Sequence, residues 1–175
     1  MNITKRIIAR LDAKHDKLIK GINLEGWRII GDLKKYANKY YLQGADEILI
    51  IDTVASLYNR EKLKEVIKAI TKDVFIPITV GGGIRSFKDA VDLFLSGADK
   101  IAVNSAAIIN PNIIKKLALS FGSQSIVSSI QAKKISNGKW TAYYESARED
   151  SNMDVIEWAK KCQDLGAGEI LITSV

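Results

Sequence analysis

Short apolar runs, rich in Ile, Leu and Val, alternate along the chain with longer stretches whose apolar positions recur every three or four residues. The short runs have the character of buried strands in a parallel sheet, and the longer stretches have the period of amphipathic helices. The pattern predicts strands at residues 7–12, 47–52, 77–80, 100–104, 125–131 and 169–173. It predicts helices at 32–43 and 59–72, from about 86, after 110–111, and at 153–165.

Local signals refine these boundaries. Ser86 and Asp89 have the spacing of a capping box, with Asp in place of Glu, and Asn110-Pro111 has the order of an N-cap followed by Pro at the first helical position. Residues 13–30 are predicted as a long loop. Asn137-Gly138, between 134–135 and 140–144, is a strong hairpin signal, so we expect a β-hairpin inserted after strand five.

The chain also repeats itself. One motif occurs three times, as Gly-Ala-Asp-Glu-Ile at 44–48, Gly-Ala-Asp-Lys-Ile at 97–101 and Gly-Ala-Gly-Glu-Ile at 166–170. A second motif occurs twice, as Leu-Asp-Ala-Lys at 11–14 and Ile-Gln-Ala-Lys at 130–133. Repeated strand–helix units at two levels predict an α/β protein of the (β/α)₈ TIM-barrel type, built from two related halves. The chain ends at Val175, two residues after the sixth predicted strand, whereas a closed barrel has eight strands. We therefore expect one domain, 1–175, with about six βα units of an incomplete barrel.

Composition narrows the class of protein. The 175 residues are 47% hydrophobic, and no apolar run approaches the ~20 residues of a membrane span. The single cysteine, Cys162, lies in a helical pattern and is expected to be a structural thiol. The net charge of +6 is spread over helices that also carry acids, which favours a phosphorylated small molecule over nucleic acid. We expect a soluble cytoplasmic protein that binds neither nucleic acid nor membranes.

Barrel active sites lie at the C-terminal ends of the strands, which here carry several polar or glycine residues. A glycine run brings backbone N–H groups close to phosphate, although a tight turn would explain it equally well. Asp12 is suited to general acid–base chemistry; its alternative role is to cap a loop. The strand-end candidates are Asp12, Asp52, the glycines 81–83, Asn104, Ser105, Gln131 and Ser174.

Charged residues mark the opposite ends of four strands, namely Arg6, Glu47, Lys100 and Glu169. They would form a ring if the strands close around an axis. From spacing alone, ordinary solvated strand ends explain them better.

Many of these motifs together resemble the cyclase subunit of imidazole glycerol phosphate synthase, over essentially the whole chain. The shared segments are 6–9, 11–12, 20–21, 44–47, 80–84, 97–100, 104–107, 121–124 and 166–171. The resemblance implies a (β/α)₈ lyase of histidine biosynthesis that needs neither metal nor cofactor. Such a subunit forms a heterodimer with a glutaminase, whose ammonia enters at the barrel bottom. It converts a bis-phosphorylated ribulosyl-formimino aminoimidazole carboxamide nucleotide to imidazole glycerol phosphate and a purine precursor.

The resemblance also assigns roles to residues. Asp12 takes the place of one catalytic aspartate, Lys20 that of a substrate-covering lysine, and Asp99 that of a contact with the glutaminase. The resemblance implies a substrate or phosphate site at Lys20, Asp52, Gly82, Gly83, Asn104 and Ser105. It implies an ammonia gate at Arg6, Glu47, Lys100 and Glu169, against the interpretation as solvated strand ends.

The chain departs from the family at the second catalytic aspartate, which is Gln131 here. This replacement puts cyclase turnover in question, because an amide is neither an acid nor a base near neutral pH. The second phosphate site, on strands seven and eight, lies outside the expected units. Arg10, where the histidine enzyme usually has Cys, and residues 54–58 are similar to paralogues of surface-saccharide loci. Three hypotheses follow: a cyclase, an ammonia-channelling partner of a glutaminase for a sugar amidotransferase, and a non-functional truncated paralogue.

Overall fold

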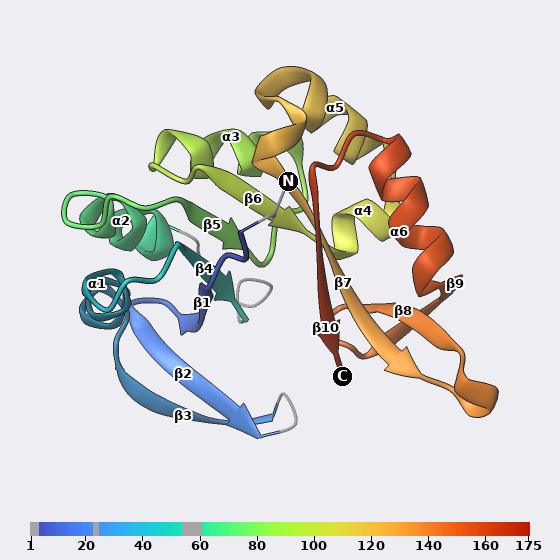
Figure 1. Ribbon diagram of the computed structural model, residues 1–175, viewed down its shortest axis with the longest axis horizontal. Coiled ribbons are helices and arrows are strands. Elements are labelled where there is room, and N and C mark those ends of the chain that lie inside the picture. The colour runs from blue at the N-terminus through green and yellow to red at the C-terminus, as the bar shows by residue number, and fades with distance from the viewer. Residues whose placement is uncertain (1–3, 23–24, 54–60) are drawn as a thin grey trace. The chain divides into compact units, whose positions relative to one another are not determined.

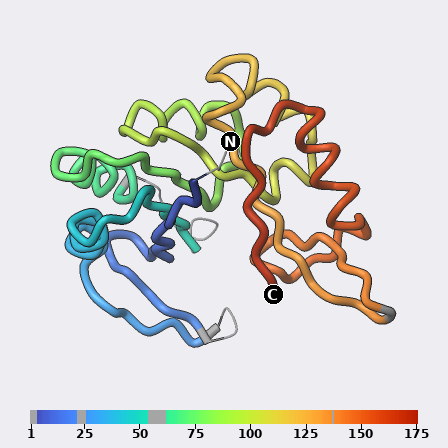
Figure 2. Tube along the Cα trace, in the orientation of Figure 1, coloured from blue at the N-terminus to red at the C-terminus, as the bar shows by residue number. Residues whose placement is uncertain are grey.

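The computed structural model describes residues 4–22, 25–53 and 61–175. The chain divides into two compact units, residues 1–83 with 92–99 and residues 84–91 with 100–175. We refer to them as the first and second unit and describe each by itself. Figures 1 and 2 trace the chain through them, and helix α3 (Phe87–Leu95) contributes residues to both.

The first unit is built on three parallel strands. Strand β1 (Ile8–Lys14) pairs with β4 (Glu47–Asp52), which pairs with β5 (Ile78–Gly81). Helix α1 (Leu33–Leu42) follows β3, and α2 (Glu61–Ile70) lies between β4 and β5 in the chain. The predicted strands at 7–12, 47–52 and 77–80 and the predicted helix at 32–43 are confirmed. The start of the second predicted helix, at Asn59, lies outside the described residues.

The predicted loop at 13–30 is wrong. It contains strand β2 (Lys17–Ile22) and most of β3 (Glu25–Asp32), which form an antiparallel hairpin on the edge of β1, so that the strand order is β3-β2-β1-β4-β5 (Figure 1). The hairpin has a register shift between Leu18 and Ile19, and both of these side chains are buried. Because the shift interrupts the alternation of inward and outward residues, the sequence shows no period of two there.

The second unit repeats this plan with more helices. Strand β7 (Ile126–Lys134) lies between parallel partners β6 (Lys100–Val103) and β10 (Glu169–Ser174), and it continues into antiparallel pairing with β8 (Trp140–Tyr144), which pairs with β9 (Glu149–Asp154). The helices are α4 (Ser105–Ile109), α5 (Asn112–Phe121) and α6 (Val155–Asp164), and two short 3₁₀ turns span Ser123–Ser125 and Ser136–Gly138.

Several predictions for this unit are confirmed. The capping box is present, because Ser86 N–H donates to Asp89 Oδ2 at 2.8 Å and Asp89 N–H donates to Ser86 Oγ at 3.2 Å. The hairpin at Asn137-Gly138 joins β7 to β8. The predicted N-cap at Asn110 is wrong: Pro111 holds the cap position of α5, and no side chain caps that helix. Strand β9 and helix α4 were not expected.

Helices cover one face of the first unit's sheet, and the opposite face carries charged and polar side chains. Leu11, Ala13, Ile48 and Ile50 are buried on the covered face, where α1 packs on β1 and β4. Since strand residues alternate between faces and register partners in a parallel pair share a face, Arg10, Asp12, Glu47, Leu49 and Thr79 belong to the opposite face. We call this second face the Glu47 face.

The two units are equivalent in detail. Ile8 of β1 pairs with Glu47, the first residue of β4, and Val127 of β7 pairs with Glu169, the first residue of β10. Asp12 and Gln131 each lie four residues further along, at the carboxyl ends of β1 and β7. The sequence echo at 11–14 and 130–133 therefore marks corresponding positions, as expected for two related halves.

The antiparallel strands of each unit, β2–β3 in the first and β8–β9 in the second, lead into the next helix in the same way. We call each of these antiparallel segments an excursion. The last residue of the excursion is an aspartate that caps the next helix: Asp32 accepts the N–H of Lys35 at 2.9 Å, and Asp154 accepts those of Ile156 and Glu157 at 2.8 and 3.1 Å. Such caps stabilise a helix by about 1 kcal/mol.

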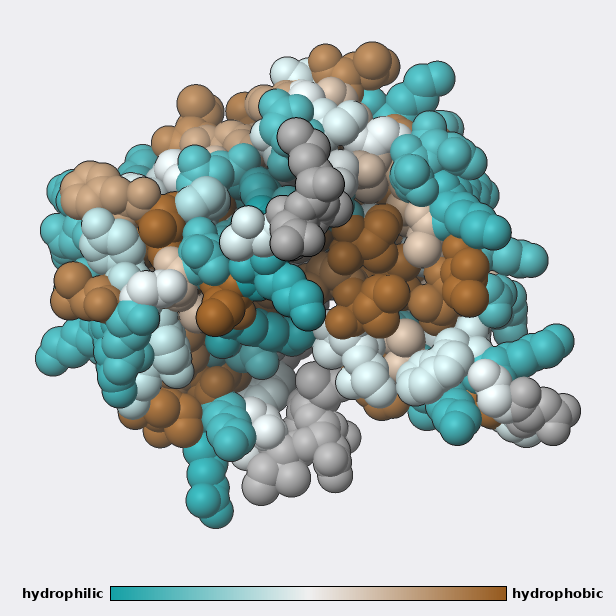
Figure 3. All heavy atoms as spheres, viewed as in Figure 1, coloured by the Kyte–Doolittle hydropathy of each residue, from teal (hydrophilic) through white to brown (hydrophobic). Residues whose placement is uncertain are grey.

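Apolar side chains also remain on the surface. Ile170 and Ile172 on β10 are exposed, and Figure 3 shows hydrophobic residues gathered over the part of the second unit that contains this strand. In the described part of the chain, no helix is long and apolar enough to cross a membrane.

Candidate functional site

Asp12 lies at the carboxyl end of β1 on the Glu47 face, as predicted for a residue of the site. Its neighbour on the same strand face, Arg10, donates from Nε to Asp12 Oδ1 at 2.9 Å. About a third of each side chain is exposed, 34% for Arg10 and 31% for Asp12. The carboxylate is therefore reachable from solvent, but one of its oxygens is already engaged by a permanent cation. Sequence analysis selected Asp12 as a site residue, noted Arg10 only as a difference from the histidine enzyme, and missed the ion pair between them.

The glycine run after β5 lies against the end of β4. A Cβ on Gly82 would stand 2.1 Å from the carbonyl oxygen of Asp52, and Gly82 and Gly83 both have positive φ, +97° and +60°. This close approach of two backbones excludes any larger residue at 82. Asp52 is itself buried. Tight packing thus explains Gly82 fully, and the phosphate role of these glycines stays a prediction.

Lys20 is exposed on β2, within the hairpin that replaces the predicted loop. Its register partner on β3 is Arg28, so that two cations face each other across the strands. Like charges in such a pair repel unless an anion lies between them. The arrangement is compatible with the predicted contact between Lys20 and a phosphorylated substrate.

In the second unit, Asn104 and Ser105 follow β6. Asn104 Nδ2 donates to the carbonyl oxygens of Ser129, at 2.9 Å, and Tyr143, at 3.1 Å, which ties the end of β6 to β7 and β8. Ser105 Oγ accepts the N–H of Glu145 at 3.1 Å and lies 3.3 Å from Asn104 Oδ1. Both predicted phosphate-site residues therefore also have a structural role.

Gln131, which the sequence places at a predicted catalytic position, also has a structural role. Its Oε1 accepts the N–H of Ala147 at 2.8 Å, in the turn between β8 and β9. Glu145, Ser146 and Ala147 have φ of +48°, +59° and +62°, a left-handed run without glycine. Such residues are strained by about 1 kcal/mol or more each. Ser105 and Gln131 hold this turn in place through two of its N–H groups.

A polar cluster beside this turn escaped sequence analysis. Asp150 Oδ1 accepts from Thr141 Oγ1 at 2.7 Å and from the N–H of Asn152 at 2.8 Å, and these bonds hold the pKa of the Asp150 carboxyl below its usual range. Partial desolvation, together with the charge of Asp150, raises the pKa of Tyr143, whose ring lies beneath Lys133 Nζ. The residues come from three strands, and only the strand register brings them together.

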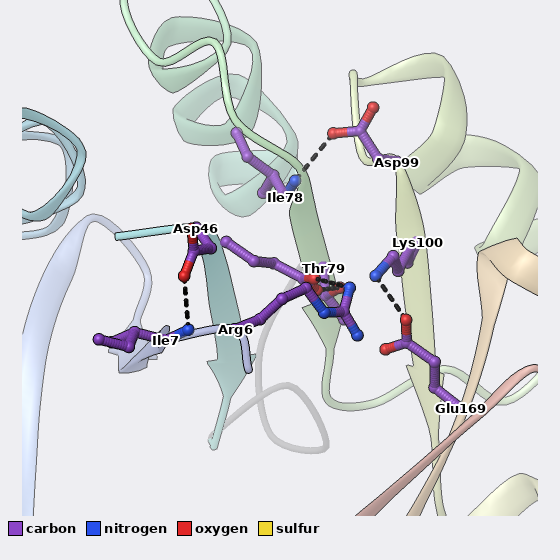
Figure 4. Close-up of polar contacts among 9 residues, drawn as sticks. Arg6, Ile7, Asp46, Ile78, Thr79, Asp99, Lys100 and Glu169 are labelled. Carbon is purple, nitrogen blue, oxygen red and sulfur yellow. Dashed lines mark hydrogen bonds and ion pairs between the residues drawn. The ribbon is translucent and has the colours of Figure 1, made fainter. Parts of the chain in front are cut away.

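The charged residues at the strand starts form ion pairs within each unit (Figure 4). In the first unit, Glu47 is only 2% exposed; its Oε2 accepts from Arg6 at 3.1 Å, and Thr79 Oγ1 donates to its other oxygen. In the second unit, Lys100 Nζ lies 2.8 Å from Glu169 Oε1, and its side chain is 12% exposed. Glu47 and Lys100 are more buried than solvated strand ends would be, whereas Arg6 and Glu169 are 49% and 27% exposed, and the role of the four residues as a gate stays a prediction.

The aspartates of the repeated Gly-Ala-Asp motif have a role that the sequence did not reveal. Asp46 Oδ2 accepts the N–H of Ile7 at 2.7 Å, and Asp99 Oδ2 accepts that of Ile78 at 2.8 Å (Figure 4). Each aspartate also donates its own N–H to the carbonyl of the same partner. The third copy has Gly168, whose N–H donates to Ser123 and Ile126 carbonyls, and a Cβ there would meet Ser123 O at 2.3 Å.

Comparison with known proteins places the chain in a family. A family model described as "Histidine biosynthesis protein" matches residues 6–175. The chain is 54% identical over 170 residues to imidazole glycerol phosphate synthase subunit HisF of Legionella pneumophila, covering 97% of this chain and 80% of that protein. It is 46% identical over 173 residues to the subunit of the same name from Bacillus cereus (strain G9842), covering 99% and 69%.

The chain belongs to the HisF family of histidine biosynthesis proteins.

Membership of the HisF family confirms the predicted fold class, an α/β protein of the TIM-barrel type with a mostly parallel sheet. The curated HisF relatives are named as subunits, which describes proteins that work in an assembly. In the described part of the chain, no three His, Cys, Asp or Glu residues are grouped in a way that would hold a metal ion.

Proposed function

We propose that this chain is the cyclase subunit of imidazole glycerol phosphate synthase. It receives ammonia from a glutaminase subunit and converts the bis-phosphorylated ribulosyl-formimino nucleotide to imidazole glycerol phosphate. The observation that carries the proposal is the 54% and 46% identity to two curated HisF subunits over nearly the whole chain. The two ion pairs at the strand starts support it.

At the carboxyl ends of the strands, Asp12 is the acid–base residue of the proposed reaction. Lys20, on the hairpin, is the proposed contact that covers the substrate, and the other proposed contacts lie at the carboxyl ends of strands or directly after them. Such acid–base assistance typically accelerates a reaction by about 10²–10⁴-fold. The proposed substrate and phosphate residues are Lys20, Asp52, Gly82, Gly83, Asn104 and Ser105.

At the opposite ends, Arg6–Glu47 and Lys100–Glu169 are the proposed gate through which ammonia enters. A buried carboxylate with two hydrogen-bonded partners keeps a fixed geometry, and an entrance needs that property. Asp99 is the proposed contact with the glutaminase. One of its oxygens is bonded to Ile78, so the side chain is held at the start of the strand.

A second candidate function is favoured by the surroundings of Gln131. Its amide oxygen is engaged by Ala147, and an amide does not transfer protons at neutral pH. A subunit that only passes ammonia from a glutaminase to a sugar amidotransferase, as in the surface-saccharide paralogues, needs the gate and not two carboxylates. This candidate differs from the first in one measurable property, which is turnover of the nucleotide.

The deciding experiment measures imidazole glycerol phosphate formed from the nucleotide and ammonium salt by the purified chain, without glutaminase. A cyclase gives turnover that Asp12→Asn abolishes. An ammonia-channelling subunit gives none, yet raises glutamine hydrolysis by its glutaminase partner. Absence of both activities would overturn both candidates.

Two variants separate the chemistry of Gln131 from its structural role. Gln131→Asp introduces the family's carboxylate on a shorter side chain, which no longer reaches Ala147. Gln131→Glu introduces a carboxylate of unchanged length that still accepts this N–H. If only Gln131→Asp restores turnover in an otherwise inactive chain, the position of the carboxylate limits the reaction; if Gln131→Glu restores it too, the presence of a carboxylate is sufficient.

A further inference from the structure

The Glu47 face of the first unit arranges its polar groups in successive levels along the strands. Ile8 pairs with Glu47 at the first level, Arg10 with Leu49 at the second, and Asp12 with Ile51 at the third. At about 3.3 Å per residue, each level lies roughly 7 Å beyond the one before. Arg10 is thus halfway between the buried carboxylate of Glu47 and the carboxylate of Asp12.

Arg10 is an unusual residue for this intermediate level. Its partner across the strands is Leu49, and Thr79 completes the level on β5 as the register partner of Leu49. A guanidinium carries five N–H donors and has no acceptor atom of its own. That of Arg10 is directed toward the third level, because its Nε bonds Asp12 Oδ1.

Ammonia and ammonium ion respond to such a group in opposite ways. Ammonia has a lone pair, so it accepts a hydrogen bond from a guanidinium. Ammonium ion, the dominant form in neutral water, has only donors and a positive charge, so Arg10 repels it. Asp12 would attract ammonium if it were alone, and Arg10 already occupies one of its two oxygens.

We propose that Arg10 makes this face selective for neutral ammonia, because its ion pair offsets the charge of Asp12, the carboxylate that lies beyond Glu47 among the described residues of β1, β4 and β5 and that would otherwise hold ammonium ion. The inference rests on the proposed function in one respect, namely that ammonia passes from the Glu47 level to Asp12. Arg10 is a specificity-determining residue in this scheme and takes no part in the proton transfers.

The test measures ammonium binding directly and needs no substrate. The backbone amide signals of Asp12 and Ala13 are followed by NMR as ammonium chloride replaces tetramethylammonium chloride at constant ionic strength. Tetramethylammonium has the same charge and cannot donate a hydrogen bond. The proteins compared are the native chain, Arg10→Met, Arg10→Lys, and the double variant Arg10→Met with Asp12→Asn.

The native chain and Arg10→Lys are expected to show no saturable response to ammonium. Arg10→Met is expected to bind it at least about tenfold more tightly than the native chain, and the double variant is expected to lose that binding. Equal responses of the native chain and Arg10→Met would overturn the inference, as would the absence of a response in Arg10→Met. If Arg10→Met does not fold, Arg10→Gln replaces it, and saturable binding by the native chain alone is already decisive.

The outcome is independent of the turnover assay. A chain that excludes ammonium but forms no imidazole glycerol phosphate would retain the role of Arg10 and contradict the cyclase proposal. A chain that turns over the nucleotide and binds ammonium at Asp12 would support the cyclase and contradict the role of Arg10.

Discussion

The amide oxygen of Gln131 accepts the backbone N–H of Ala147 at 2.8 Å and so joins the end of β7 to the left-handed turn between β8 and β9. Ala147 has φ of +62°, a conformation that a residue with a Cβ adopts only when its surroundings impose it. Gln131 therefore has a structural role of its own, whatever its proposed part in catalysis. A substitution of Gln131 can therefore change activity through the turn as well as through the loss or gain of a catalytic group.

Shortening this side chain should release the turn. In Gln131→Asn, the amide lacks the methylene group that brings its oxygen to Ala147, so that N–H loses its acceptor. A net hydrogen bond contributes about 0.5–1.5 kcal/mol, which corresponds to roughly twofold to tenfold faster exchange. Hydrogen exchange at Ala147, followed by NMR or mass spectrometry, measures the change. Gln131→Glu is the control and should exchange at the native rate; equal rates in Gln131→Asn and the native chain would contradict the role.

Removing the hydroxyl of Thr79 should destabilise the chain through Glu47. Thr79→Val keeps the shape of the side chain and takes one donor away from a carboxylate that is 2% exposed. Hydrogen bonds to charged groups contribute about 1.5–3 kcal/mol, so the free energy of unfolding should fall by about that amount. Urea unfolding measures it. Thr79→Ser retains the hydroxyl and should lose less than half as much; equal losses would point to packing rather than the hydrogen bond.

A methyl group at residue 168 should be poorly tolerated. Gly168→Ala places a Cβ 2.3 Å from the carbonyl oxygen of Ser123, and backbone atoms on both sides have to move. We expect a loss of about 2–4 kcal/mol in the free energy of unfolding, in the range of severe overpacking. Gly44→Ala is the control that has backbone strain without a clash, because Gly44 has φ of +85° and a Cβ there would have nothing within 4 Å. Its cost should be about 1–2 kcal/mol, and a greater loss at Gly44 than at Gly168 would contradict the clash.

Acid should loosen the β8–β9 strand pair before the rest of the second unit. The pKa of Asp150 is lowered in the folded chain, so its stabilising effect is complete above the unfolded value of about 4 and is lost as pH falls through the lower folded value. The protection factor of the Asn152 amide, which removes the intrinsic pH dependence of exchange, should therefore fall below about pH 4. In Asp150→Asn this pH dependence should be reduced, and an unchanged dependence would assign it to another carboxylate.

The sequence was most informative where local chemistry alone decides the structure. The bounds of β4 and the start of α1 agree with their predictions to within a residue, because a continuous buried run and the capping Asp32 are local signals. Strand β9 gave no such signal. Its sequence is polar, Asn152 has φ of +58°, and the pairing with β8 shifts register between Thr141 and Tyr143, so only the neighbouring strand makes it a strand.

For the candidate site too, the sequence predicted some features and not others. The rule that chemistry lies at strand ends selected Asp12, Asn104 and Gln131 from sequence. The contacts of the last two depend on tertiary structure and could not be predicted: Asn104 reaches a carbonyl of β8, and Gln131 accepts an N–H of the turn between β8 and β9. The ion pairs at the strand starts needed the same information, since exposure alone separates a buried Glu47 from a solvated strand end.

The aspartates at the ends of β3 and β9 have a consequence for how such a protein diversifies. Each antiparallel excursion, of different length and sequence in the two units, returns to the framework on a single residue that also starts the next helix. What lies before that residue is free to vary in length, twist and charge while the helix still begins at the same point. The hairpins of the two units are thereby separable from the frame that carries them, because the capping aspartate and not the hairpin sets where the next helix begins.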